Sequence, residues 1–188
     1  YSGAGPNSQT ITVTPNLSGC IGPAQTVMVL VNPTPVVNNI NDVTRCTGQN
    51  ISVPITGTTG ATMSWTNDNT AIGLASTGIG TIAAFTATNS TNAAIVANIT
   101  VTPNYSNAGK ICSGSPQTFT ITVNPAPLVQ FSPATNQTIC SGNATNAVTL
   151  TSSTSGATIS WVCTQPAGIT GVVTSGTTTI PVQTLTNL

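Results

Sequence analysis

The sequence predicts an all-β protein made of tandem antiparallel β-sandwich repeats, and three observations predict it. Residues 10–14, 95–102 and 118–123 alternate Ile, Val or Phe with Thr or Asn, as strands with one buried face do. These short segments are separated by Gly, Asn, Ser and Pro, which is typical of strands joined by turns, and no segment has helical spacing. The third observation is an internal repeat, which sets the order of the elements.

The internal repeat keeps its order along the chain. The sequence ITVTPN at 11–16 returns at 99–104, and VNPTP at 31–35 returns as VNPAP at 123–127. The offset grows from 88 residues at the first motif to 96 at the tryptophans, because loops between fixed strands accept small insertions. Other matched pairs are Cys20 with Cys112, Cys46 with Cys140, and Trp65 with Trp161.

The repeat divides the chain into one complete domain and two incomplete ones. We expect residues 34–125 to form a complete sandwich, residues 1–33 to hold the last strands of one repeat, and residues 126–188 to hold the first strands of another. The Pro-rich segments 32–35 and 124–127 are the expected boundaries, because Pro ends strand pairing and stiffens a connector. The repeats are therefore cut out of phase, so each incomplete end lacks the strands that the other carries.

A tryptophan marks the expected core of each repeat. Met63 and Trp65 lie two residues apart, as do Ile159 and Trp161, so each pair shares one face of a strand. A Trp on a central strand is typical of a sandwich core. The functional alternative is an exposed Trp that stacks on a sugar.

Charged side chains are almost absent, and this excludes several classes of function. The chain has two basic residues, two acidic residues and no His, whereas about a quarter of an average soluble domain is charged. Two cations cannot neutralise a run of phosphates, so nucleic acid is not an expected partner. Paired carboxylates and clustered metal ligands are missing too, so we expect no enzyme, no metal and no cofactor. The apolar runs are too short for a membrane span.

The five cysteines predict disulfides. Cys46 precedes the first core strands of the complete repeat and Cys112 lies before its last strand, so we expect a bond between them, worth roughly 4 kcal/mol. The same reasoning pairs Cys20 with Cys140 of an adjacent copy. Cys163 shares the inward face of its strand, which predicts a buried free thiol without the base that a nucleophile needs.

Asn-x-Ser/Thr triplets offer candidate glycosylation sites. Such triplets also arise by chance in a chain so rich in Asn, Ser and Thr, but sugars on Asn, Ser or Thr would help an almost uncharged surface stay soluble. The candidates are Asn16, Asn50, Asn89, Asn98, Asn104, Asn136 and Asn143.

Five short motifs lie on or beside the expected strands: Cys46-Thr47-Gly48, Ser64-Trp65, residues 99–103, Cys112-Ser113-Gly114 and residues 116–127. Together they resemble the PKD-like and Ig-like repeats of very large surface proteins of Bacteroidota. The resemblance implies an Ig-like fold and export through an outer-membrane route, often the type IX pathway. It also implies a role in adhesion, gliding or extracellular filaments, and it specifies no ligand.

The sequence leaves three functions open. The leading hypothesis is a structural repeat of an extracellular fibre or adhesin at the cell surface, whose partners are adjacent copies of itself and a surface polysaccharide or a neighbouring or host cell. The second is a self-polymerising filament subunit, completed by strand donation between copies. The third is a carbohydrate-binding module of a secreted protein, for which Tyr105 is the aromatic to test.

Overall fold

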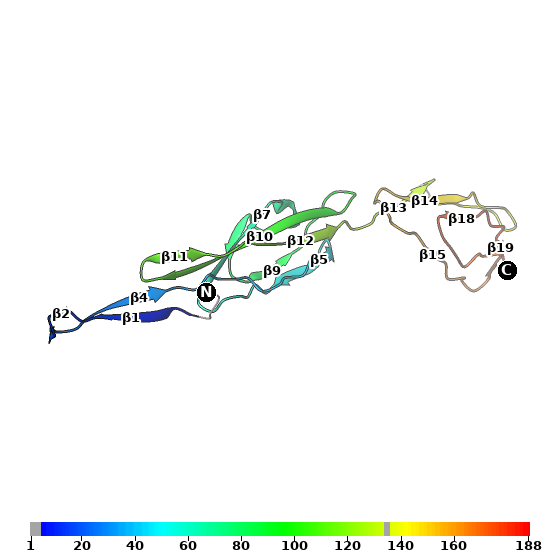
Figure 1. Cartoon of the computed structure of the whole chain (residues 1–188). Helices are drawn as coiled ribbons and strands as arrows, with labels where there is room; N and C mark the ends of the chain where they lie inside the picture. The colour runs from blue at the N-terminus through cyan, green and yellow to red at the C-terminus, as the bar shows by residue number, and fades with distance from the viewer. Residues whose placement is uncertain (1–4, 134–135) are drawn as a thin grey trace. The chain divides into compact units, whose positions relative to one another are not determined.

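The computed structural model describes residues 5–133 and 136–188 of the chain. It divides into two compact units, one of residues 1–89 with 95–124 and the other of residues 90–94 with 125–188. Strands form the regular structure of both (Figure 1), so the all-β prediction is confirmed. No helix in the described part of the chain is long and apolar enough to cross a membrane.

In the first unit, residues 34–89 and 95–124 form two sheets around one core, and we call this part the complete sandwich. One sheet has the order β5-β12-β10-β7-β8, with β11 added to β10, and β6 pairs with β9 in a second sheet. Strands β10 and β12 run antiparallel, whereas β5 pairs with β12 in parallel. The elements are β5 (Val43–Cys46), β6 (Asn50–Val53), β7 (Thr62–Asn67), the 3-10 turn η1 (Thr70–Ile72), β8 (Thr77–Ile79), β9 (Ile82–Thr86), β10 (Ile95–Asn107), β11 (Lys110–Ser113) and β12 (Gln117–Asn124).

The core of the complete sandwich follows the period of two in its strands. In β10 the apolar residues Ala97, Ile99 and Val101 are fully buried, while the residues between them are at least partly exposed. Met63 and Trp65 on β7 are also buried, as the sequence predicts. Strands β6 and β9 contribute to the same core, so the apolar layer involves both sheets.

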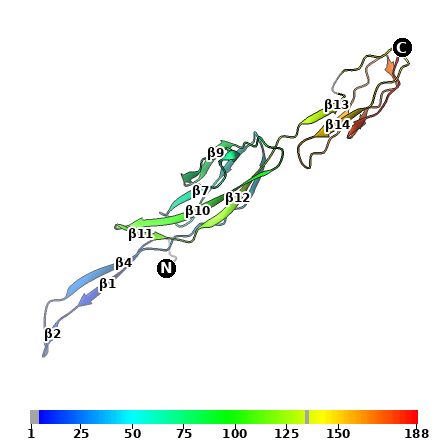
Figure 2. The same cartoon turned by 90° about the horizontal axis from the view of Figure 1, so that it is seen from above.

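Strands β10 and β11 continue past β12 as a two-stranded arm, residues 104–113. Ala108 and Gly109 turn the arm at positive φ. Two hydrogen bonds join Asn32 and Asn107: Asn107 Nδ2 donates to Asn32 Oδ1 over 2.9 Å, and Asn32 Nδ2 donates to the main-chain oxygen of Asn107 over 3.3 Å. Figure 2 shows the arm beside the end of β4.

The connector before the complete sandwich is buried at the base of this arm. Pro33 and Pro35 are both fully buried. A Cβ atom on Gly114 would lie 1.7 Å from the Pro35 carbonyl oxygen, so only glycine allows the two backbones to approach this closely. The Pro-rich segment is therefore a fixed junction within this unit.

The N-terminal hairpin, residues 7–31, has the same register as the two central strands of the complete sandwich. Ile11 faces Val27 in the hairpin as Ile99 faces Phe119 in the sandwich, with all other pairs in step. Among the described residues no third strand pairs with the hairpin. Its strands are β1 (Asn7–Val13), β2 (Asn16–Leu17), β3 (Cys20–Ile21) and β4 (Gln25–Val31).

The C-terminal unit, residues 125–188 with 90–94, contains short paired strands. Sheets of order β13-β14-β18, β15-β17 and β16-β19 are formed within it. The strands are β13 (Val129–Ser132), β14 (Val148–Ser152), β15 (Trp161–Val162), β16 (Ile169–Thr170), β17 (Ser175–Gly176), β18 (Thr179–Ile180) and β19 (Thr186–Asn187).

The C-terminal unit reproduces local geometry of the first half of the complete sandwich. Trp161 pairs with Gly176 as Trp65 pairs with Gly78, and each glycine lies under the indole of its partner. Cys163 N donates to Thr174 O in the position where Asn67 N donates to Ser76 O. The turn after the matched cysteine is also the same: Asn143 N donates to Cys140 O and Gln49 N donates to Cys46 O.

Candidate functional site

The N-terminal hairpin presents an uncovered apolar face. Ile11 and Val13 are 45% and 59% exposed, whereas Ile99 and Val101, at the same positions of the other hairpin, are 0% exposed. The facing strand differs in the same way, because its inward residues are about half exposed and their counterparts are buried. The facing residues are Val27, Val29 and Val31, which match Phe119, Ile121 and Val123.

The C-terminal unit has an open apolar groove of about 340 Å³. The Trp161 ring borders it and is only partly buried, with its Nε1 donating to Thr179 O over 3.1 Å. The other apolar lining residues are Pro127, Leu128, Val129, Phe131, Leu150, Ala157 and Ile159.

The edge of β15 beside this groove lacks a partner strand. In the complete sandwich, β7 pairs with β8 along one edge and with β10 along the other. In the described part of the C-terminal unit, β15 pairs only with β17, which is the counterpart of β8. Residues 137–140, which match β5, lie outside any strand. Among the described residues this unit has no strands equivalent to β10 and β12, whereas the N-terminal hairpin has the register of those two strands.

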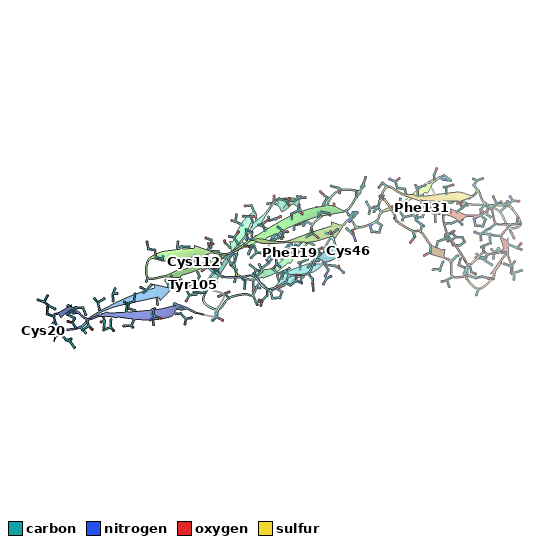
Figure 3. The ribbon with its side chains drawn as sticks, viewed as in Figure 1. Cys20, Cys46, Tyr105, Cys112, Phe119 and Phe131 are labelled. Carbon is teal, nitrogen blue, oxygen red and sulfur yellow. The ribbon has the colours of Figure 1, made fainter. Side chains whose placement is uncertain are left out.

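The structure does not support the predicted bond between Cys46 and Cys112, because they lie at opposite ends of the sandwich (Figure 3). Cys46 pairs with Asn124 at one end of the sheet, and Cys112 pairs with Tyr105 on the arm. Measured along the strands, Cys46 and Cys112 are about ten residues apart, which is a distance of about 33 Å. A disulfide needs Cα atoms within about 7 Å. The sequence correctly predicts that Cys46 precedes the first core strands and that Cys112 lies before the last strand. It does not reveal that the parallel pairing of β5 with β12 places the two cysteines at opposite ends of the sandwich.

The remaining three cysteines are exposed free thiols in this chain. Cys20 lies near the tip of the N-terminal hairpin, facing Leu17, just as Cys112 faces Tyr105. Cys163 is exposed rather than buried, which corrects that prediction. Cys163 directly follows β15, which pairs only with β17 among the described residues, so alternation along the sequence does not predict whether Cys163 is buried.

The candidate glycosylation sites differ in accessibility. Asn89 is buried and its Nδ2 donates to Val123 O over 2.7 Å, so the folded sandwich cannot carry a sugar there. Asn98 Nδ2 donates to Asp68 Oδ2, and Asn104 Oδ1 accepts from Ser113 Oγ. Asn98 is exposed nonetheless, as are Asn16, Asn50, Asn136 and Asn143.

The polar groups of the complete sandwich serve the fold. Asp68 Oδ1 accepts from Asn98 N and its Oδ2 from Asn98 Nδ2, both over 2.7 Å. These bonds, the side-chain one first, hold the pKa of Asp68 below its ordinary value. Asp42 Oδ1 accepts from Thr120 N, so both acids bind strand N–H groups. No group of three His, Cys, Asp or Glu residues gathers in the part of the chain that the structure describes.

The aromatic that the sequence offers for sugar binding lies on the arm. Tyr105 is half-buried, and a Cβ atom on Gly60 would lie 3.3 Å from its ring. The sequence missed the glycines under the two tryptophans and the pairing of Asn32 with Asn107. Matching Gly78 with Gly176 in the repeat would have found the first, but no local pattern signals the second.

Comparison with protein-family models finds no match to this chain. No curated protein is significantly similar to it in sequence.

Proposed function

We propose that this chain is a structural subunit of an extracellular fibre, in which the N-terminal hairpin of one copy completes the C-terminal unit of the next. One observation carries the proposal: the hairpin has the register of β10 and β12 but exposes the face that those strands bury. The chain then acts mechanically, by linking sandwiches, and has no catalytic role.

The complete sandwich gives the register of the joint. Val101 faces Trp65 and Ile99 faces Asn67 across β10 and β7. By the same pairing, Val13 faces Trp161 of the second copy, and Ile11 faces its Cys163. Strand β4 then lies beside residues 137–140, as β12 lies beside β5. The added hairpin thus gives a partner strand to β15 and to residues 137–140, and it also covers the groove of the C-terminal unit.

Burial of apolar side chains would drive the joint. Five residues on the inward face of the hairpin are now about half exposed, and completing their burial contributes about 1 kcal/mol each. Main-chain hydrogen bonds between β1 and β15 fix the register. The residues are Ile11, Val13, Val27, Val29 and Val31.

The strand order supports an Ig-like, PKD-like repeat as the unit of the fibre. In an Ig-like sandwich the C, F and G strands form one sheet and the B and E strands belong to the other. The order β7-β10-β12 with β6-β9 opposite follows this plan. Repeats joined through buried Pro connectors would form a semi-rigid array.

The composition supports an extracellular, cell-surface location. The solvated faces of the strands carry Thr, Ser and Asn rather than charges, and five candidate glycosylation sites are exposed. Such a fibre would suit adhesion, gliding or a matrix, with surface polysaccharides or neighbouring cells as further partners. It matches the role implied by the resemblance to surface proteins of Bacteroidota.

Sugar binding is the second candidate, and the open groove is the observation that favours it. Phe131 and Trp161 line the groove, and aromatic rings are the usual platforms for sugars. The two proposals compete for one surface. If a sugar binds the free chain and a peptide of residues 5–31 displaces it, both ligands bind the groove. If the chain binds no sugar on a glycan array, this second candidate is removed.

The test is a pair of charge substitutions on the two faces of β1. Val13 is equivalent to Val101, which is buried, so Val13→Asp would bury a carboxylate in the joint between copies. The association constant should fall at least 100-fold, or about 3 kcal/mol. Thr10→Asp is the matched control, because the equivalent Asn98 is exposed and the variant should assemble like the wild type. Sedimentation and electron microscopy measure the outcome. Equal assembly of both variants, or a chain that stays monomeric at high concentration, contradicts the proposal.

Native material distinguishes separate copies from one continuous polypeptide. After boiling in detergent with a reductant, separate copies give a band at the mass of one copy, to which residues 1–188 contribute 18.8 kDa. A much larger band means that the hairpin and its receptor are repeats of one long chain. The proposal of separate copies predicts the small band.

A further inference from the structure

The cysteines of the complete sandwich lie at its two junctions. Cys46 is paired with Asn124, immediately before the connector that leaves the sandwich. Cys112 is on the arm, which lies beside the connector that enters the sandwich. Figure 3 labels both, at opposite ends of the sheet. Neither thiol can therefore reach the other, and both lie where a neighbouring sandwich begins.

The arm of one sandwich reaches the end of the preceding one. Asn107 on the arm is hydrogen-bonded to Asn32, which ends the N-terminal hairpin. Asn32 occupies the position of Asn124 in the repeat, and Asn124 faces Cys46. When the hairpin completes the C-terminal unit of another copy, Asn32 faces Cys140 of that copy, since Cys140 matches Cys46. The arm therefore brings Cys112 to the junction that holds Cys140 of the other copy.

The second junction follows from the same equivalence. Cys20 faces Leu17 as Cys112 faces Tyr105, so the tip of the N-terminal hairpin is a shorter arm. After the hairpin completes a neighbour's C-terminal unit, this short arm points back along the neighbour, toward the end of its complete sandwich. The cysteine at that end is Cys46.

We propose that two disulfides join each pair of adjacent copies: Cys46 with Cys20 of the second copy, and Cys140 with Cys112 of that same copy. The inference rests on the proposed fibre and adds a covalent lock to its strand exchange. It replaces the expected pairing of Cys20 with Cys140, which would lie at opposite ends of one completed sandwich, about 33 Å apart. Cys163 remains a free thiol.

Each bond forms by ordinary thiol–disulfide exchange. The two cysteines lose two protons and two electrons, and a small or protein disulfide of the compartment takes them up and becomes two thiols. Oxidised glutathione serves as this oxidant in the experiment. Strand exchange first brings the thiols together, so the disulfides form after assembly. Once formed, they make the fibre resistant to detergent.

Two double variants distinguish this pairing from all others. C20S/C46S removes both members of one proposed bond and leaves Cys112 with Cys140, so fibres oxidised with glutathione should still give a ladder of multimers in detergent without reductant. C46S/C112S removes one member of each bond, so the same treatment should give only monomer. C163S should behave like the wild type. A persistent ladder for C46S/C112S, or its loss in C20S/C46S, overturns the pairing.

Mass spectrometry of mixed fibres shows whether the bonds join different copies. Equal amounts of ordinary and ¹⁵N-labelled chain are unfolded together, assembled, oxidised, and digested without reduction. The expected linked peptides are Cys20 with Cys46 and Cys112 with Cys140, about half of each carrying both isotopes. Linkage of Cys46 to Cys112, linked peptides without mixed isotopes, or free thiols throughout intact fibres overturns the inference but leaves the fibre. Absence of fibres in electron microscopy removes the proposed function instead.

Discussion

The two hairpins of this chain have closely similar sequences and one register, yet opposite surroundings. Ile99 and Val101 are in a closed core, while Ile11 and Val13 are about half exposed. The tryptophans show the same contrast, because Trp65 is buried and Trp161 borders an open groove. A strand sequence of this kind specifies which residues share a face, but only a second layer buries that face. In the proposed fibre, the uncovered hairpin of one copy and the open groove of the next are complementary parts of one sandwich.

The largest expected difference between the two regions comes from one substitution made at both matched positions. Ile99→Ala leaves a cavity in the closed core and should lower the free energy of unfolding by about 2–5 kcal/mol. Ile11→Ala should change it by less than about 0.5 kcal/mol in the dilute, reduced chain. Denaturant unfolding followed by Trp65 fluorescence, in a Trp161→Phe background, measures both. Similar losses for the two variants would mean that the hairpin is already packed in the single chain.

A smaller contrast concerns the glycines under the tryptophans. A Cβ atom at Gly78 would lie 2.1 Å from the Trp65 ring, which the core holds in place, so Gly78→Ala should cost about 1–3 kcal/mol. Gly176→Ala should cost less, because the Trp161 ring has the open groove to move into. Thermal unfolding followed by the fluorescence of each tryptophan alone gives the comparison. A larger cost at Gly176 would show that its ring is the more tightly held.

The smallest effect is a dependence on pH that only the complete sandwich should show. The pKa of Asp68 is lowered by the hydrogen bonds from Asn98, so its contribution to stability is present above the ordinary value of 3.8 and is lost as pH falls through the lower folded value. In the repeat, Thr164 of the C-terminal unit stands in place of Asp68, and Thr10 of the hairpin stands in place of Asn98. Asp68→Asn should flatten the fall in stability below pH 3.8. Unchanged acid sensitivity in that variant would exclude Asp68 as its source.

Sequence patterns alone predict the faces of strands well in this protein. Alternation places Met63 and Trp65 in the core, and the repeat matches β1 and β4 with β10 and β12, in agreement with the register. These properties are local, because neighbouring side chains on a strand point to opposite faces.

Positions along the sandwich are harder to predict. The separation of Cys46 from Cys112 depends on β5 pairing in parallel with β12, and on an arm that extends beyond the sheet. Cys163 is exposed, although alternation along its segment predicts burial. Asn89, which reads as a glycosylation triplet, donates instead to the carbonyl of Val123 inside the sandwich. Such contacts join residues far apart in sequence, so no short motif encodes them.

Hydrogen–deuterium exchange before and after assembly tests strand exchange most directly. The amides of residues 9–13 and 159–163 should exchange quickly in the monomer, and in the fibre they should reach the protection of residues 97–101 in β10. Residues 97–101 are the internal reference, since β10 is already paired on both edges in the single chain. Fibres in which residues 9–13 and 159–163 exchange as fast as in the monomer would contradict the account.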